Sequence, residues 1–155
     1  MKRFILVCLA LALLFACCGP AIAAEAPPAN QIASNLTSDS GEWFSTLRSS
    51  NFQISYTSYG IEKTSSSSVF VSATARTNET ASVIGVLITV QRWANNRWNN
   101  YKSISGTSVG ATSCSRSGTV SVASGYYYRI HVIYDASSGS NSQTLHRYSK
   151  SVLIQ

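Results

Sequence analysis

Aromatic rings beside a turn are the first candidates for chemistry in this sequence. Trp93, Trp98 and Tyr101 surround an asparagine-rich stretch, in which Asn95 and Asn96 favour a tight hairpin turn. Exposed rings on a β-scaffold can stack on the apolar faces of sugars, while neighbouring amides bond sugar hydroxyls. The alternative is structural, with one tryptophan closing the end of the core and the other pairing across the two strands.

The stretch "SGYYYRIHVIYD" supplies a second candidate surface. Side chains alternate between the two faces of a strand, so Tyr127, Arg129 and His131 share one face. This mixed face should meet solvent, where it could contact a ligand or form only a ladder of cation–π contacts and hydrogen bonds. The other face is apolar and should point into the core; it carries Tyr126, Tyr128, Ile130, Val132 and Tyr134.

Groups suited to catalysis are scarce. His131 and His146 lack a clustered carboxylate or thiolate, and the chain has no Gly-x-Ser-x-Gly elbow. The carboxylates fall in a spacer, at the domain edge or near predicted turns, which disfavours the fixed pair that glycoside hydrolysis needs. The sequence therefore predicts a protein that is not an enzyme and has no metal site or cofactor. A small hydrolase using one of the histidines is the remote alternative. The carboxylates are Glu25, Asp39, Glu42, Glu62, Glu79 and Asp135.

Strand patterns must position these residues. Alternating apolar residues recur in "NFQISYTSY", "SVFVSATART", "SVIGVLITVQRW", "SRSGTVSVAS" and "QTLHRYSKSVLI", separated by Gly, Ser and Asn clusters. With the tyrosine-rich stretch and the arms of the asparagine turn, about seven strands result. The pattern predicts an all-β fold, an antiparallel β-sandwich that is immunoglobulin-like in the broad sense, with a small β-barrel as the alternative. Gly125 and Tyr127 also have the spacing of the tyrosine corner of such sandwiches.

The amino-terminal segment has the layout of a secretory signal peptide. Lys2 and Arg3 precede an apolar run of about a dozen residues, which is shorter than the ~20 that a membrane-spanning helix needs, and small residues follow. We expect residues 1–23 to be removed and the mature chain to hold no transmembrane segment. Residues 24–40 then read as a flexible spacer, and residues 41–155 as a single β-sandwich domain.

Cysteine usage leaves a second interpretation of the leader. The stretch "LFAC" resembles a bacterial lipobox, in which Cys17 would be lipidated and would anchor the chain at the cell surface. Cleavage after the leader leaves Cys114 alone, so no internal disulfide is then possible. If Cys17 were lipidated, Cys18 would survive and could pair with Cys114.

The charge distribution is mildly basic. The chain has 12 Lys and Arg against 6 Asp and Glu, and removal of the leader takes away Lys2 and Arg3. The remaining cations are scattered rather than clustered, which argues against nucleic acid as a partner. Such a surface could favour anionic cell-wall polymers or acidic glycans, although solubility explains it equally well.

Several of these features together resemble a family of short exported bacterial proteins of unknown function. They are the leader, the polar spacer, "VFVSATA", "VLITVQRWANNRWNNY" and "GYYYRIHVIYDASSGSNSQT", over about Ser68–Gln155. The resemblance implies a secreted location and an all-β fold, and it brings no activity or functional residues.

The sequence as a whole favours a secreted, non-enzymatic β-domain that binds a cell-envelope or extracellular polymer, such as a glycan, or a protein partner. The candidate binding residues are Trp93, Trp98, Tyr101, Tyr127, Arg129 and His131. The alternative is a structural protein that associates with itself or with partners through the edges of its sheet.

Overall fold

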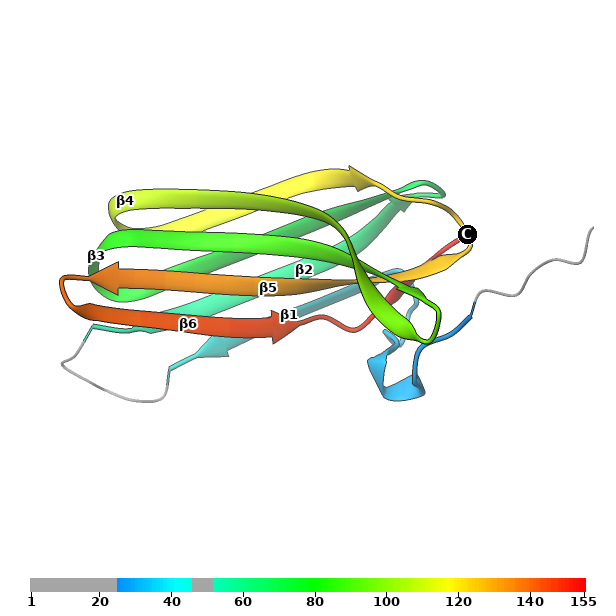
Figure 1. The fold of residues 1–155 in the computed structure, drawn as a ribbon, viewed down its shortest axis with the longest axis horizontal. Coiled ribbons are helices and arrows are strands. Elements are labelled where there is room, and N and C mark those ends of the chain that lie inside the picture. The colour runs from blue at the N-terminus through cyan, green and yellow to red at the C-terminus, as the bar shows by residue number, and fades with distance from the viewer. Residues whose placement is uncertain (1–24, 46–51) are drawn as a thin grey trace, which may run out of the picture.

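The computed structural model describes residues 25–45 and 52–155, which fold almost entirely into β-strands (Figure 1). Neighbouring strands of the sheet pair antiparallel, and this confirms the predicted all-β, antiparallel fold of about seven strands. A 3₁₀ turn at Ala29–Gln31 precedes the first strand. The strands are β1 (Ser38–Phe44), β2 (Ile54–Ser65), β3 (Ser68–Ala94), β4 (Arg97–Ser121), β5 (Tyr126–Ser138), β6 (Asn141–Tyr148) and β7 (Val152–Ile154).

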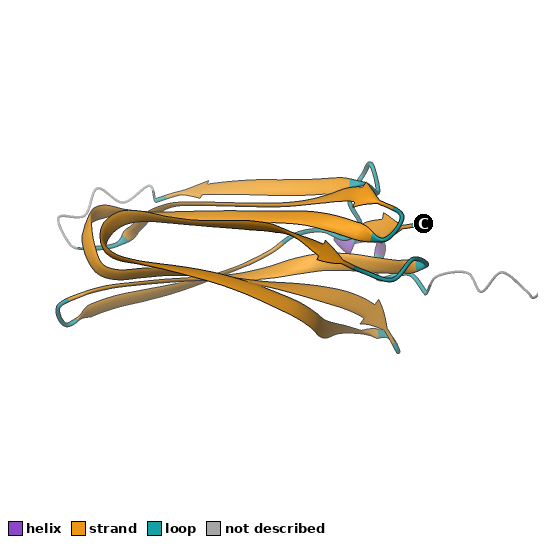
Figure 2. Ribbon diagram, turned by 90° about the horizontal axis from the view of Figure 1, so that it is seen from above, coloured by secondary structure: helices purple, strands orange, loops and turns teal. Residues whose placement is uncertain are grey.

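The strands belong to one continuous hydrogen-bonded sheet. Its order is β1-β2-β3-β5-β6, with β4 paired to the other edge of β3 and β7 paired to the start of β5. The sheet curls back on itself into a half-barrel, so that two layers of strands face one another in Figure 2. One curled sheet thus takes the place of the separate sheets that define a typical sandwich.

The curl depends on β3, which is longer than either strand predicted for this region. The stretches "SVFVSATART" and "SVIGVLITVQRW" are consecutive parts of one 27-residue strand, with a register shift between Arg76 and Ala81. The first part of β3 pairs with β2 and the second part with β5, while β4 follows both. We call the layer containing β1 and β2 the first half-sheet, and the layer containing β5 and β6 the second.

Two-residue alternation fills the space between the half-sheets. Tyr126 was expected among the inward residues and is instead 37% exposed, because β5 only begins there and its ring lies over the Arg92 guanidinium. The fully buried inward residues are Val69, Val71, Ala75, Ala81, Ile84, Ile88 and Val90 of β3, and Tyr128, Ile130, Val132 and Tyr134 of β5.

Two hydrogen bonds cross directly from one half-sheet to the other. The Tyr134 hydroxyl donates to the Ser58 carbonyl at 2.7 Å, and the Ile54 amide donates to Gln143 Oε1 at 2.6 Å. The Tyr134 side chain is buried, and burial raises the pKa of its hydroxyl, so this group stays protonated and remains a donor. The bond therefore fixes the spacing of the two layers.

The backbone contact of a corner tyrosine, considered for Tyr127 on its spacing from Gly125, is made by Tyr128 instead. Tyr128, and not Tyr127, accepts from the Ala123 amide at 3.1 Å and donates to the Ala123 carbonyl at 3.0 Å. The pleat explains the difference, because Tyr128 points inward toward the chain entering β5, whereas Tyr127 points to the opposite face.

Residues 24–40, expected to be a flexible spacer, make contacts that a flexible spacer would not make. β1 begins at Ser38, within residues 24–40, and the preceding residues bond to the end of the chain. The Ser151 amide donates to the Gln31 carbonyl at 2.6 Å, and the Ala33 amide donates to the Ser151 carbonyl at 2.9 Å. Alternating polarity is absent here, so periodicity gave no signal for this edge of the domain.

The predicted leader, residues 1–23, lies outside the described residues, as does Cys17. Within the part of the chain that is described, no helix has the length and apolar character needed to cross a membrane. Cys114 lies in β4 and is buried as a free thiol.

Replacing Tyr134 with Phe should destabilise the fold by about 1–2 kcal/mol, because the Ser58 carbonyl loses its donor while the ring still fills the core. Urea unfolding gives the free energy. Tyr148→Phe is the matched control, since the ring of Tyr148 is 50% exposed and its hydroxyl has solvent as an alternative partner. Equal unfolding free energies for the two variants would contradict the role assigned to the crossing bond.

Candidate binding face

The tip of the β3–β4 hairpin positions the two tryptophans. Asn95 and Asn96 have φ angles of 56° and 57°, the left-handed conformations that a two-residue turn of this type requires. The turn places Trp93 opposite Trp98, and their rings meet edge to face with centroids 5.2 Å apart. Trp93 is buried while Trp98 stays half-buried, so only Trp98 is presented toward a ligand.

Arg129 lies between two rings on the outer face of the second half-sheet. Its Cζ atom is 4.4 Å from the centroid of Trp98 and 4.8 Å from that of Tyr148. Its Nε donates to Gln91 Oε1 at 2.8 Å, and Gln91 Nε2 donates to Asn100 Oδ1 at 2.9 Å. Side chains from β3, β4, β5 and β6 thus hold the guanidinium plane in one orientation.

His131 continues the same face. Its ring is stacked on Tyr148 at 4.3 Å and 5°, and it is also stacked on His146 at 5.3 Å and 20°. His131 Nε2 and His146 Nδ1 are 3.0 Å apart and share a hydrogen bond, in which the N–H of one ring donates to the nitrogen of the other. Burial lowers the pKa of His131 below its usual value, and the nearby His146 and Arg129 charges lower it further.

These side chains make a single surface feature, which we call the cation–aromatic row. It consists of Trp98, Arg129, Tyr148, His131 and His146. The row is braced at one end, where Trp98 Nε1 donates to Gln31 Oε1 at 2.7 Å. It spans three strands and joins residues up to 50 positions apart only because the register brings them into adjacent rows.

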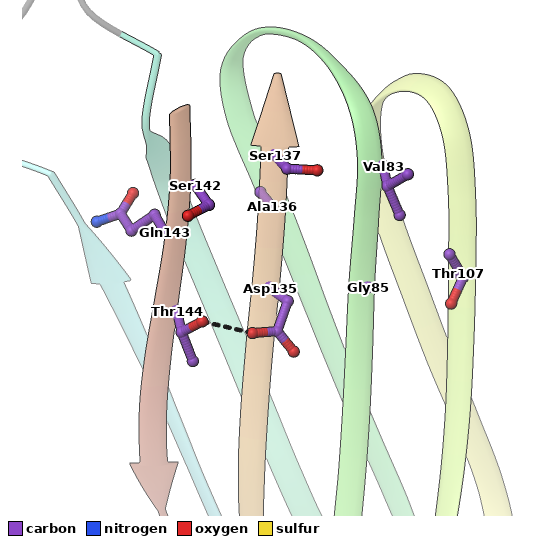
Figure 3. Close-up of a pocket in the computed structure, with 9 residues that line it drawn as sticks. All are labelled: Val83, Gly85, Thr107, Asp135, Ala136, Ser137, Ser142, Gln143 and Thr144. Carbon is purple, nitrogen blue, oxygen red and sulfur yellow. Dashed lines mark hydrogen bonds between the residues drawn. The ribbon is translucent and has the colours of Figure 1, made fainter. Parts of the chain in front are cut away.

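A shallow hollow of about 260 Å³ lies on the same half-sheet, farther along β5 (Figure 3). Gly85 has no side chain there, and the Asp135 carboxylate accepts from the Thr144 hydroxyl at 2.6 Å. Thr107 and Ser137 add hydroxyls to the rim. The hollow is open, and its lining combines hydroxyls and a carboxylate with apolar surface, as the hydroxyls and apolar faces of a sugar require.

The candidate residues from the sequence divide into two groups. Trp98, Arg129 and His131 come together in the cation–aromatic row. Tyr127 shares the face of Arg129 but lies opposite Leu153 of β7, and Trp93 is buried beneath the turn. Tyr101 belongs to a different cluster, in which its ring contacts Tyr128 and lies 5.6 Å from the Arg92 guanidinium.

Sequence reasoning did not include Tyr148, His146 and Gln91 among the binding residues. Tyr148 and His146 lie in "QTLHRYSK", whose alternation does place them on one face of a strand. The missing information was the pairing of β6 with β5, which sets Tyr148 opposite His131. Gln91 gave no local signal, because it ends a run of core residues.

The face offers ring surface for stacking and polar groups for hydrogen bonding. His131 is paired with His146, and the Asp135 carboxylate is occupied by Thr144. Among residues 25–45 and 52–155, no group of three or more His, Cys, Asp and Glu side chains could hold a metal ion. What the geometry provides is one oriented guanidinium, two imidazoles and exposed ring surface.

No model of a known protein family matches the chain, and no curated protein matches it. The resemblance to short exported bacterial proteins therefore stays a prediction that rests on the quoted motifs.

The His131 environment predicts that acidification destabilises the folded protein. Because the pKa of His131 is lowered in the fold, the unfolded chain binds more protons than the folded chain once the pH falls below about 6.5. The contribution of neutral His131 to the free energy of unfolding is therefore fully present above that pH. It is lost progressively as the pH falls from there to the pKa of His131 in the folded protein. NMR titration should give His131 a midpoint below the usual value. His146→Gln should raise that midpoint, since one of the charges that lower it is removed. A midpoint at or above the usual value in the unmodified protein would contradict this account.

Proposed function

We propose that this protein is an exported, non-enzymatic binding module that holds a polysaccharide of the cell envelope or extracellular space. In this proposal the curled sheet is an immunoglobulin-like sandwich in the broad sense, and the ligand binds to the outer face of the second half-sheet. The observation that carries the proposal is the cation–aromatic row, in which five side chains from three strands contact one another on one open face.

The polar groups around the row match the needs of a carbohydrate. Asn100 provides an exposed planar amide and Ser103 an exposed hydroxyl, and each is hydrogen-bonded to a buried partner, Gln91 at 2.9 Å and Thr89 at 3.0 Å. Sugar hydroxyls both donate and accept, so amides and hydroxyls side by side can satisfy them. A flat, polar strip of this kind fits an extended chain better than a small compact ligand.

Ring availability points to Tyr148 as the stacking residue. Both rings contact Arg129, and each has one further ring neighbour, but Tyr148 is 50% exposed at the edge of the row whereas Trp98 is half-buried. A sugar that stacks on Tyr148 would lie beside both Arg129 and His131. We therefore assign the stacking role to Tyr148 and a bracing role to Trp98.

The proposal that the protein is exported rests on the leader sequence. Residues 1–23 carry the charged, apolar and small-residue regions of a signal peptide, and this supports a secreted location. Lipidation at Cys17 is the alternative, and it would place the same binding face at the cell surface.

Retention on insoluble cell-wall polysaccharide tests the function. Tyr148→Ala should weaken retention about tenfold, because a stacked ring contributes roughly 1–1.5 kcal/mol. Phe70→Ala is the matched control, since Phe70 is an exposed ring of the first half-sheet and should leave retention unchanged. If the unmodified protein is not retained, and a glycan array is also silent, the polysaccharide proposal is wrong.

Strand addition is the second candidate function, and β4 is the observation that favours it. Among the strands of the described residues, this 25-residue strand pairs only with β3, so its other edge carries no further strand of that part of the chain along either half-sheet. Arg97, Lys102 and Arg116 are its only charged residues, and like charges at an edge oppose pairing with a second copy. This repulsion ranks self-association below polysaccharide binding.

Light scattering distinguishes the two functions. We expect a monomer at concentrations up to about 100 μM, where weak, transient interfaces stay dissociated. If the protein forms dimers or larger species, and the Ser105→Pro substitution in β4 dissociates them into monomers, self-association replaces polysaccharide binding as the leading proposal. Circular dichroism of the Ser105→Pro variant checks that it remains folded.

A further inference from the structure

Arg129 carries a positive charge that no carboxylate of the described chain neutralises. Its guanidinium has five N–H donors, and within the described residues only Nε donates to a protein acceptor, Gln91. The four N–H groups on the two Nη atoms are therefore available. Because these form a planar fork, they fit the two oxygens of a carboxylate or sulfate group.

The location of this charge makes an external anion the natural partner. Arg129 is half-buried between Trp98 and Tyr148, and burial lowers its pKa because the charged form loses solvation. The two rings compensate only part of this loss, since a cation–π contact is worth less than a charge-assisted hydrogen bond pair. A bound anion would supply the missing compensation.

The histidine pair can add a second positive charge beside the first. The charged and titratable groups facing His131 are Arg129 and, farther along, Asp135 on β5, and His146 and Tyr148 on β6. The neighbouring row of β3 and β4 presents only the hydroxyls of Thr89 and Ser103. One proton added to the pair keeps an N–H···N bond and makes the site more positive.

The far end of the face has the opposite charge. Asp135 is six residues from Arg129 on β5, which corresponds to about 20 Å along an extended strand. Its carboxylate would repel an anion but would accept hydrogen bonds from sugar hydroxyls in the hollow of Figure 3. The face is therefore polarised, and a ligand with one acidic group would bind in a single direction.

We propose that the face binds an acidic polysaccharide, with a carboxylate or sulfate group on the Nη atoms of Arg129, uncharged hydroxyls toward Asp135, and tighter binding as the pH falls. This inference rests on the proposed polysaccharide function and specifies its ligand. It assigns Arg129 as the residue that recognises charge, His131 and His146 as the pair that tunes it, and Tyr148 as the ring beside the sugar.

A matched set of polymers tests the inference. Dextran, carboxymethyl dextran and dextran sulfate share one backbone and differ in charge and in the source of that charge. Calorimetric titration of the mature protein at 150 mM salt should give at least tenfold tighter binding to one or both charged polymers than to dextran. Arg129→Gln should remove that advantage, because glutamine keeps a planar polar group without the charge.

Arg76→Gln is the matched control. Arg76 also lies over a ring, 5.5 Å from the Tyr56 centroid, but on the first half-sheet, so the substitution removes the same net charge elsewhere. Binding should stay within twofold of the unmodified protein. If both substitutions weaken binding equally, the attraction is a net-charge effect and the site is overturned.

The outcomes separate this inference from the function on which it rests. Equal binding of all three polymers, or retention on cell-wall polysaccharide that is insensitive to Arg129→Gln, would overturn the acidic specificity and leave the polysaccharide module standing. Absence of binding to the three polymers and to cell-wall polysaccharide would overturn both.

The pH dependence is measured with dextran sulfate, whose charge does not change between pH 7.5 and 5.5. Affinity should rise severalfold over this range, and the rise should disappear in a variant with both His131→Gln and His146→Gln. A rise of the same size in that double variant would overturn the role of the histidine pair. Circular dichroism at each pH confirms that the variants remain folded.

Discussion

The structure depends on one strand that belongs to both layers. β3 runs for 27 residues, and its inward side chains line the core on each side of the register shift between Arg76 and Ala81. Because β2 and β5 pair with different parts of this strand, their separation is set by its course. Burial of the two apolar rows against each other then holds the curl, and the Tyr134 bond to Ser58 keeps the layers at a fixed distance.

Arginine side chains in this protein are stabilised mainly by cation–π contacts with aromatic rings. With six carboxylates in the whole sequence, ion pairing is limited, and four arginines lie over aromatic side chains instead. These are Arg76 over Tyr56, Arg92 over Tyr101 and Tyr126, Arg129 over Trp98 and Tyr148, and Arg147 over Trp43. Arg129 differs from the others because an oriented amide chain fixes its plane on the same face as two histidines.

Local patterns in the sequence predict much of this fold but only part of the site. Alternation placed Tyr128, Ile130, Val132 and Tyr134 inward, and the asparagines indicated the hairpin turn. Alternation cannot show that two strands are continuous, so β3 was divided in two. It also cannot show which strands are neighbours, and Tyr148 therefore escaped notice although it completes the row. Trp93 and Trp98 looked equivalent, and only burial separates them.

The amino-terminal segment holds the binding face at the hairpin tip. Gln31 accepts from the ring nitrogen of Trp98, and Glu25 accepts from the Asn96 amide, so the segment grips the hairpin tip. Tension applied at the amino end acts on these two bonds before it reaches the strand ladders of the core. A molecule tethered there and pulled would loosen the ring that supports Arg129 while the sheet is still intact, and it would release its ligand under load without unfolding.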